Sequence, residues 1–130
     1  MDLIDEVVSS GIPHDRIILG GFSQGGAVSL YTAFSQTKAV GGVAVLSGYV
    51  PKAKTFIVNE AVKNVPVFWG HGTADPVVQF KWAEKSRDLL KSQNVNNIDW
   101  RVYPGMQHSA CPEEIDAFSA FLTRILPAHK

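Results

Sequence analysis

Three side chains spread along the chain, Ser23, Asp75 and His108, are of the types that carry out nucleophilic catalysis. A serine hydroxyl with its ordinary pKa is a poor nucleophile, so it needs a histidine as general base and an acidic group that fixes the tautomer of that histidine. Ser23 is the central residue of Gly21-Phe22-Ser23-Gln24-Gly25, which has the G-x-S-x-G pattern of a nucleophile elbow. The sequence therefore predicts that Ser23 is a nucleophile, that His108 is its base and that Asp75 orients the base.

The turn around Ser23 predicts an exposed hydroxyl and one donor for a developing oxyanion. A turn of this kind strains the serine backbone, so we expect Gly21 and Gly25 to occupy places where a side chain would clash. The backbone N–H of Gln24, at the positive end of the helix that follows, would then point at the oxyanion. The alternative is a glycine-rich turn in which Ser23 only caps the helix.

Alternatives stay open for the other two side chains as well. Asp75 precedes Pro76 and could serve only to start the next helix, and His108 lies in a glycine-bounded loop where it could face solvent. His71 is a rival base, but it lies on the same loop as Asp75, which favours a role in bracing that loop. His71, Asp75 and His108 match a metal site by ligand type alone, and because no short-spaced ligand pair supports it we expect no metal.

Apolar patterns along the chain predict alternating strands and helices. Short apolar or alternating runs predict four strands, at 16–19, 43–46, 65–69 and 98–103. Helical spacing of apolar residues predicts four helices, at 1–10, 24–34, 77–91 and 112–126. The irregular segment 48–64 predicts a long connection with a short helix near Glu60. Strands separated by helices indicate a parallel sheet, in which residues that follow the strands reach the same edge.

The composition fits one globular domain over residues 1–130, with 45% hydrophobic and 18% charged residues. Lysine plus arginine and aspartate plus glutamate balance at 12 each, which argues against nucleic acid or an anionic membrane as a partner. A single cysteine, Cys111, cannot form an internal disulfide, which favours a reducing compartment. The acidic first residues do not resemble a signal peptide and no apolar run is long enough to span a membrane, so we expect a cytoplasmic protein.

Several segments resemble the acyl-protein thioesterase, or phospholipase/carboxylesterase, family of α/β-hydrolases. They are the nucleophile segment 16–27, the substrate-side loop 47–51, the acid loop 71–78 and the histidine loop 103–109. The nucleophile segment is the most specific of the four. The resemblance implies a triad in which Ser23 is the nucleophile, His108 acts as general base and then as general acid, and Asp75 orients His108.

The chain also departs from the family. Members of the family begin with further strands and a His-Gly-containing loop that supplies a second oxyanion donor, and no segment here resembles that part. The resemblance therefore implies a truncated α/β-hydrolase with a mainly parallel sheet of about four strands flanked by helices. Without the preceding strands, the strand at 17–19 becomes a sheet edge, so we expect a homo-oligomer or pairing with the missing N-terminal segment.

The leading hypothesis is a serine hydrolase that cleaves acyl thioesters or carboxylic esters through an acyl-enzyme and needs no cofactor. Its substrate would be an acylated protein or a lipid-like ester. The alternative is a catalytically impaired or silent fragment that acts as an interaction or regulatory module, and a lyase or transferase using the same elbow is a weaker third hypothesis. Apolar candidates for the acyl pocket are Tyr49, Val50, Val77 and Met106, with Phe56 and Trp69 as further candidates, although Trp69 is more typical of a core residue.

Overall fold

The computed structural model describes residues 16–36, 38–51 and 55–126. The helix predicted at 1–10 lies outside these residues. The described elements, in chain order, are β1 (Ile18–Phe22), α2 (Gln24–Ser35), β2 (Gly42–Leu46), the 3₁₀ helix η2 (Glu60–Val62), β3 (Val67–Gly72), α3 (Phe80–Ser92), β4 (Ile98–Tyr103) and α4 (Pro112–Ile125). Strands and helices therefore alternate as the apolar pattern predicts.

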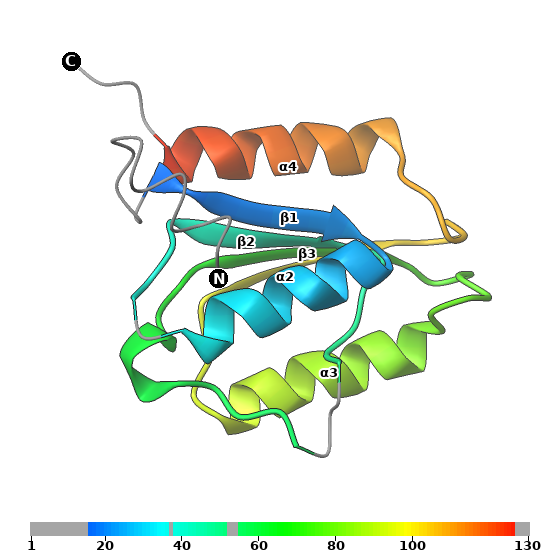
Figure 1. Ribbon diagram of the computed structural model, residues 1–130. Coiled ribbons are helices and arrows are strands. Elements are labelled where there is room, and N and C mark those ends of the chain that lie inside the picture. The colour runs from blue at the N-terminus through cyan, green and yellow to red at the C-terminus, as the bar shows by residue number, and fades with distance from the viewer. Residues whose placement is uncertain (1–15, 37, 52–54, 127–130) are drawn as a thin grey trace.

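The four strands form one parallel sheet in the order β1-β2-β3-β4. Figure 1 shows α2 and α3 on one face of this sheet and α4 on the other. Because every strand runs in the same direction, the loops that follow β1, β3 and β4 all emerge at one edge of the sheet. The predicted architecture, part of an α/β-hydrolase with a parallel sheet flanked by helices, is confirmed.

Side chains that alternate along the central strands fill two cores. Val43 and Val45 of β2 point toward α2 and α3, whereas Ala44, between them, packs on the α4 side. The larger core joins these two valines to buried residues of the helices and of β3, namely Leu30, Phe34, Val67, Trp69, Ala83 and Leu90. The smaller core, under α4, contains Ala44, Phe68 and Phe121. All six residues of β3 are buried, so the strand is covered on both faces. Side chains on both faces must then be apolar, which explains the unbroken apolar run at the start of β3.

Two strands are longer than the sequence predicts. The strand predicted at 16–19 begins instead at Ile18 and continues through Gly20 and Gly21 to Phe22, because all three pair with β2. β3 continues through His71 and Gly72, which pair with the end of β4. Glycine suggests a turn by its local preference, but here ladder hydrogen bonds outweigh that preference.

Helix α3 begins at Phe80, three residues later than the pattern predicts. The backbone N–H groups of Val77 and Val78 both donate to Oδ1 of Asp75, at 2.8 and 2.9 Å, and so fold into a turn rather than a helix. The short helix expected near Glu60 is present as η2, where the Asn59 side chain accepts a hydrogen bond from the Ala61 N–H.

Strand β1 lies at an edge of the described sheet. It pairs with β2 and, within the part of the chain that the structure describes, with no strand on its other side. Its residues are half-buried or exposed, in contrast to the buried strands β2 and β3. No helix among the described residues is long and apolar enough to cross a membrane.

Candidate active site

The turn between β1 and α2 holds Ser23 in a strained backbone conformation. Its φ is 57° and its ψ is −117°, a region that side-chain-bearing residues rarely occupy. The Ser23 N–H donates to the carbonyl of Leu46 at the end of β2, at 2.8 Å, which fixes the turn on the sheet. The Ser23 side chain makes no capping hydrogen bond to α2, so its hydroxyl is directed elsewhere.

Close approach of two chain segments requires glycine in this turn, but not at both predicted positions. A Cβ on Gly21 would collide with the backbone of Gly25, so the expectation for Gly21 agrees with the structure. A Cβ on Gly25 would meet nothing within 4 Å, so the predicted clash there is wrong. The second tight position is Gly26, where a Cβ would lie 3.0 Å from the Gly21 carbonyl oxygen and from a Val45 methyl group.

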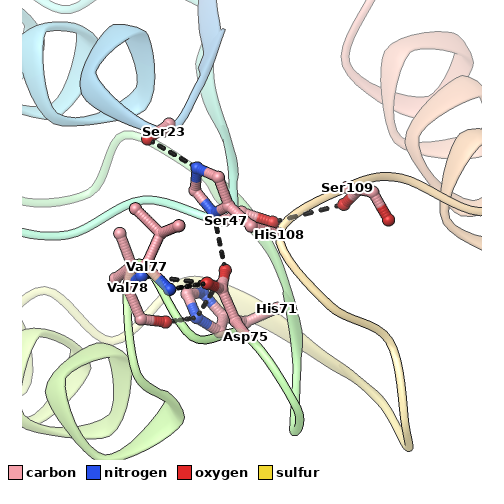
Figure 2. A network of polar contacts seen from close by, with 8 residues as sticks. All are labelled: Ser23, Ser47, His71, Asp75, Val77, Val78, His108 and Ser109. Carbon is pink, nitrogen blue, oxygen red and sulfur yellow. Dashed lines mark hydrogen bonds and ion pairs between the residues drawn. The ribbon is translucent and has the colours of Figure 1, made fainter.

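The hydroxyl of Ser23, the imidazole of His108 and the carboxylate of Asp75 form one chain of hydrogen bonds (Figure 2). His108 Nε2 lies 2.9 Å from Ser23 Oγ, and His108 Nδ1 lies 2.7 Å from Asp75 Oδ2. In the neutral imidazole, Nδ1–H donates to Asp75 and Nε2 accepts from the hydroxyl, the tautomer that a general base requires. Asp75 reaches this place from the loop after β3, and His108 from the loop after β4.

Asp75 is held as a carboxylate although it is only 4% exposed. Burial alone would raise its pKa, but hydrogen bonds from His108 and from the backbone N–H groups of Val78 and Val77 outweigh that effect and lower the pKa. The two oxygens have separate partners, since Oδ1 accepts from the backbone and Oδ2 faces His108. Asp75 therefore does not cap α3, and its charge is available to orient and stabilise the imidazole.

The rival base, His71, lies below the triad rather than within it. It is fully buried at the end of β3, and its Nε2 lies 2.7 Å from the Val78 carbonyl oxygen, to which it donates. Burial lowers the pKa of His71, which favours the neutral ring. Within the described part of the chain, its Nδ1 has no hydrogen-bond partner. His71 thus ties the strand to the far side of the turn that carries Asp75, which is a bracing contact.

A cavity of about 810 Å³ opens beside the Ser23 hydroxyl. Four residues of α3 form one wall, which consists of Trp82, Lys85, Ser86 and Leu89. The remaining lining residues are Ser23, Gln24, Tyr49, Val50, Val77 and Val78. Most of these side chains are apolar, so the cavity suits a hydrocarbon chain that ends at the Ser23 hydroxyl.

The structure brings three of the four predicted substrate-binding residues to this cavity, namely Tyr49, Val50 and Val77. Met106 lines a different pocket, formed by the histidine loop and the start of α4. Phe56 and Trp69 are 4% and 0% exposed and belong to the larger core. Gln24 lines the cavity and is the first residue of α2, as its predicted role as a backbone donor requires.

Sequence reasoning missed the wall that α3 contributes. The signal was present, since residues 82, 85, 86 and 89 share one helical face. Which face of a helix meets a cavity depends on how the helix crosses the sheet, and apolar spacing does not determine that angle. Within residues 16–36, 38–51 and 55–126, no group of three or more His, Cys, Asp or Glu side chains is arranged to hold a metal ion.

Comparison with known proteins identifies the family of this chain. The sequence profile of the Phospholipase/Carboxylesterase family matches residues 1–126. The chain belongs to this family. Acyl-protein thioesterase 1 of Neurospora crassa is 45% identical over an alignment 130 residues long, which covers 97% of this chain and 53% of that protein. Acyl-protein thioesterase 1 homolog 1 of Dictyostelium discoideum is 45% identical over 123 residues, which are 94% of this chain and 54% of that protein.

Solved structures of the same fold extend the likeness to three dimensions. Arabidopsis thaliana SOBER1 superposes with a TM-score of 0.87 at 32% identity, covering 96% of this chain and 60% of that one. Zea mays acyl-protein thioesterase 2 superposes with a TM-score of 0.83 at 29% identity, covering 96% of this chain and 62% of that one. The chain spans about half the length of the curated relatives that it matches.

Proposed function

We propose that this phospholipase/carboxylesterase-family chain carries the catalytic triad of a serine hydrolase that cleaves thioesters or esters of long acyl groups. The observation that carries the proposal is the hydrogen-bonded series from Ser23 through His108 to Asp75 at the mouth of an apolar cavity. The names of the relatives support a hydrolase and favour acylated proteins as substrates. The description of the family supports lipid-like carboxylic esters as a second substrate class. They do not favour the silent fragment.

The triad geometry supports transfer of an acyl group to Ser23. His108 Nε2 takes the hydroxyl proton as Ser23 Oγ attacks the carbonyl carbon, and the Asp75 carboxylate stabilises the imidazolium that forms. The Gln24 N–H, at the positive end of α2, is the proposed donor to the oxyanion. His108 then gives its proton to the departing thiol or alcohol, and water releases the acid by the same steps.

Covalent labelling tests the proposal directly. A fluorophosphonate probe should modify the folded protein at Ser23, because capture requires an activated serine. Ser23→Ala should abolish labelling and lower turnover of p-nitrophenyl octanoate by at least about 10³-fold, because the triad acts as a unit. The matched control is Ser119→Ala, which removes an exposed hydroxyl on α4.

Two results would contradict the proposal. Ester turnover that survives Ser23→Ala would mean that another group is the nucleophile. Folded wild-type protein that resists the probe would instead support a catalytically silent module, the alternative to this proposal.

The open side of β1 supports a second part of the proposal, which concerns assembly. Within residues 16–36, 38–51 and 55–126, no strand pairs with the other side of β1, so its backbone N–H and C=O groups on that side can pair with another segment. We propose that this side pairs with a second copy or with a preceding segment of the same protein.

A further inference from the structure

Ser86 is a buried hydroxyl in the cavity wall that the triad does not use. It lies on α3, is 8% exposed, and lines the cavity together with Ser23. Its Oγ accepts a hydrogen bond from the backbone N–H of Val50, at 3.0 Å, in a buried setting. This contact joins the α3 wall of the cavity to a second wall, formed by Tyr49 and Val50 of the segment after β2.

The segment Ser47–Val50 is attached at its other end to the catalytic side of the molecule. The Ser47 N–H donates to the Gly70 carbonyl of β3, at 2.9 Å, and the Ser47 hydroxyl donates to the Ser109 carbonyl, beside His108, at 3.4 Å. Gly48 packs closely between these ends, since a Cβ there would lie 2.5 Å from a Val45 methyl group. The segment is therefore fixed to the histidine loop by Ser47 and to α3 by Ser86.

We infer that Ser86 is a positioning residue that sets the width of the acyl-chain site by holding Tyr49 and Val50 at a fixed distance from α3. The inference rests on the proposed function. Without the Ser86 hydroxyl, the buried Val50 N–H has no acceptor and the segment moves to reach water. Tyr49 and Val50 move with the segment. The hydrogen bonds that join Ser23, His108 and Asp75 run directly between those side chains and are kept.

This arrangement separates chain-length selectivity from chemistry. A long acyl chain contacts both walls of the cavity, so its binding depends on their separation. An acetyl group contacts only the atoms near Ser23 and is insensitive to that separation. Losing the Ser86 hydroxyl therefore raises KM for long acyl esters by a larger factor than KM for acetyl esters.

The experiment compares Ser86→Ala and the isosteric pair Ser86→Thr and Ser86→Val with the wild type, using p-nitrophenyl acetate and p-nitrophenyl octanoate. Ser86→Ala and Ser86→Val should lose about tenfold in kcat/KM for octanoate, through KM, as expected for one unsatisfied buried donor. The kcat/KM for acetate should fall by a clearly smaller factor, because an acetyl group is too short to reach the α3 wall. Ser86→Thr keeps the hydroxyl and should restore octanoate hydrolysis.

The matched control is Ser92→Ala, on the same helix, whose exposed hydroxyl donates only to the nearby Leu89 carbonyl. Equal losses for both esters, or no loss for either in Ser86→Ala, would overturn the inference. If Ser86→Ala does not fold, octanoate hydrolysis by Ser86→Thr and Ser86→Val tests the inference instead. The two side chains have the same shape and similar helix propensity, so the variants differ mainly in the hydroxyl group.

A further readout separates this inference from the proposed function. Amide hydrogen exchange at Val50 should be slow in the wild type and in Ser86→Thr, and at least about tenfold faster in Ser86→Val. If the wild type neither labels nor hydrolyses esters, the proposed function fails. In that case, titration with laurate measures binding to the cavity without catalysis. Weaker laurate binding in Ser86→Val than in Ser86→Thr supports the inference, and equal binding overturns it.

Discussion

Asp75 divides its two carboxylate oxygens between folding and chemistry. Oδ1 accepts the N–H groups of Val77 and Val78 and so shapes the turn before α3, whereas Oδ2 faces His108 Nδ1. Conventional alanine replacement removes both roles at once. Replacement by asparagine separates the two roles. The asparagine side chain keeps an acceptor oxygen for the turn and changes the atom that faces the His108 imidazole.

We therefore predict that Asp75→Asn lowers ester turnover by about 10³ to 10⁴ fold, because an amide opposite Nδ1 favours the wrong tautomer of His108. The thermal midpoint should stay close to that of wild type, since the turn keeps its acceptor. Asp75→Ala should lose both turnover and thermal stability. Kinetics and thermal melts of the two variants check this prediction, and a large drop in melting temperature for Asp75→Asn would contradict it.

The sequence predicts the members of the triad but not the whole cavity. Ser23 follows from a local motif, and Asp75 and His108 follow from their places after strands of a parallel sheet. The structure brings these three together, and their roles remain a proposal. Trp82 and Ser86 were not predicted, because a helical pattern indicates which residues share a face but not what that face meets.

At the scale of elements, α4 packs an unpaired carboxyl group against the sheet. Glu114 is fully buried, and neither of its carboxyl oxygens has a hydrogen-bond partner among the residues that the structure describes. It fills the space over Gly70, where a Cβ would collide with the carboxyl group. Burial raises the pKa of Glu114 from 4.5 to about 7, so the folded chain favours the protonated form.

This pKa predicts that the fold weakens as the pH rises from about 4.5 to about 7. Below pH 4.5 Glu114 is neutral in both states and contributes no pH dependence; between pH 4.5 and about 7 only the unfolded chain releases its proton. The free energy of unfolding should therefore fall by about 3 kcal/mol across this window and then level off. Glu114→Gln should remove that fall, so its thermal midpoint should exceed that of wild type at pH 8 and match it near pH 4.

The neighbouring variant Glu113→Gln serves as the control, because that side chain is exposed on the same turn of α4. Thermal melts across the pH range check the prediction. A wild-type midpoint that does not fall between pH 4.5 and 7 relative to Glu114→Gln would show that the carboxyl group finds solvent or a partner.

Element types were predictable where one physical effect dominates. The buried strands β2 and β3 have continuous apolar runs, and α4 begins at a proline preceded by a turn, so their existence follows from local pattern. Their ends were less predictable. The start of α3 depends on hydrogen bonds to Asp75, and the extension of β3 through Gly72 depends on pairing with β4, both of which are long-range or side-chain effects.

At the scale of the whole molecule, the open side of β1 predicts self-association. Among the residues that the structure describes, β1 pairs with a strand on one side only, and another chain can cover such an unpaired edge. We expect the average mass in sedimentation equilibrium to exceed that of one chain and to increase with concentration. A single monomeric species at high concentration that binds no apolar dye would contradict this prediction.

Ser23 adopts a backbone conformation that only glycine adopts without penalty. Selection for heat resistance alone would therefore favour glycine at position 23, in place of the proposed nucleophile. A more thermostable variant that keeps Ser23 must gain its stability at other positions, such as exposed helix surfaces. The backbone strain at Ser23 stays. Heat resistance and the proposed chemistry therefore make opposite demands on this residue.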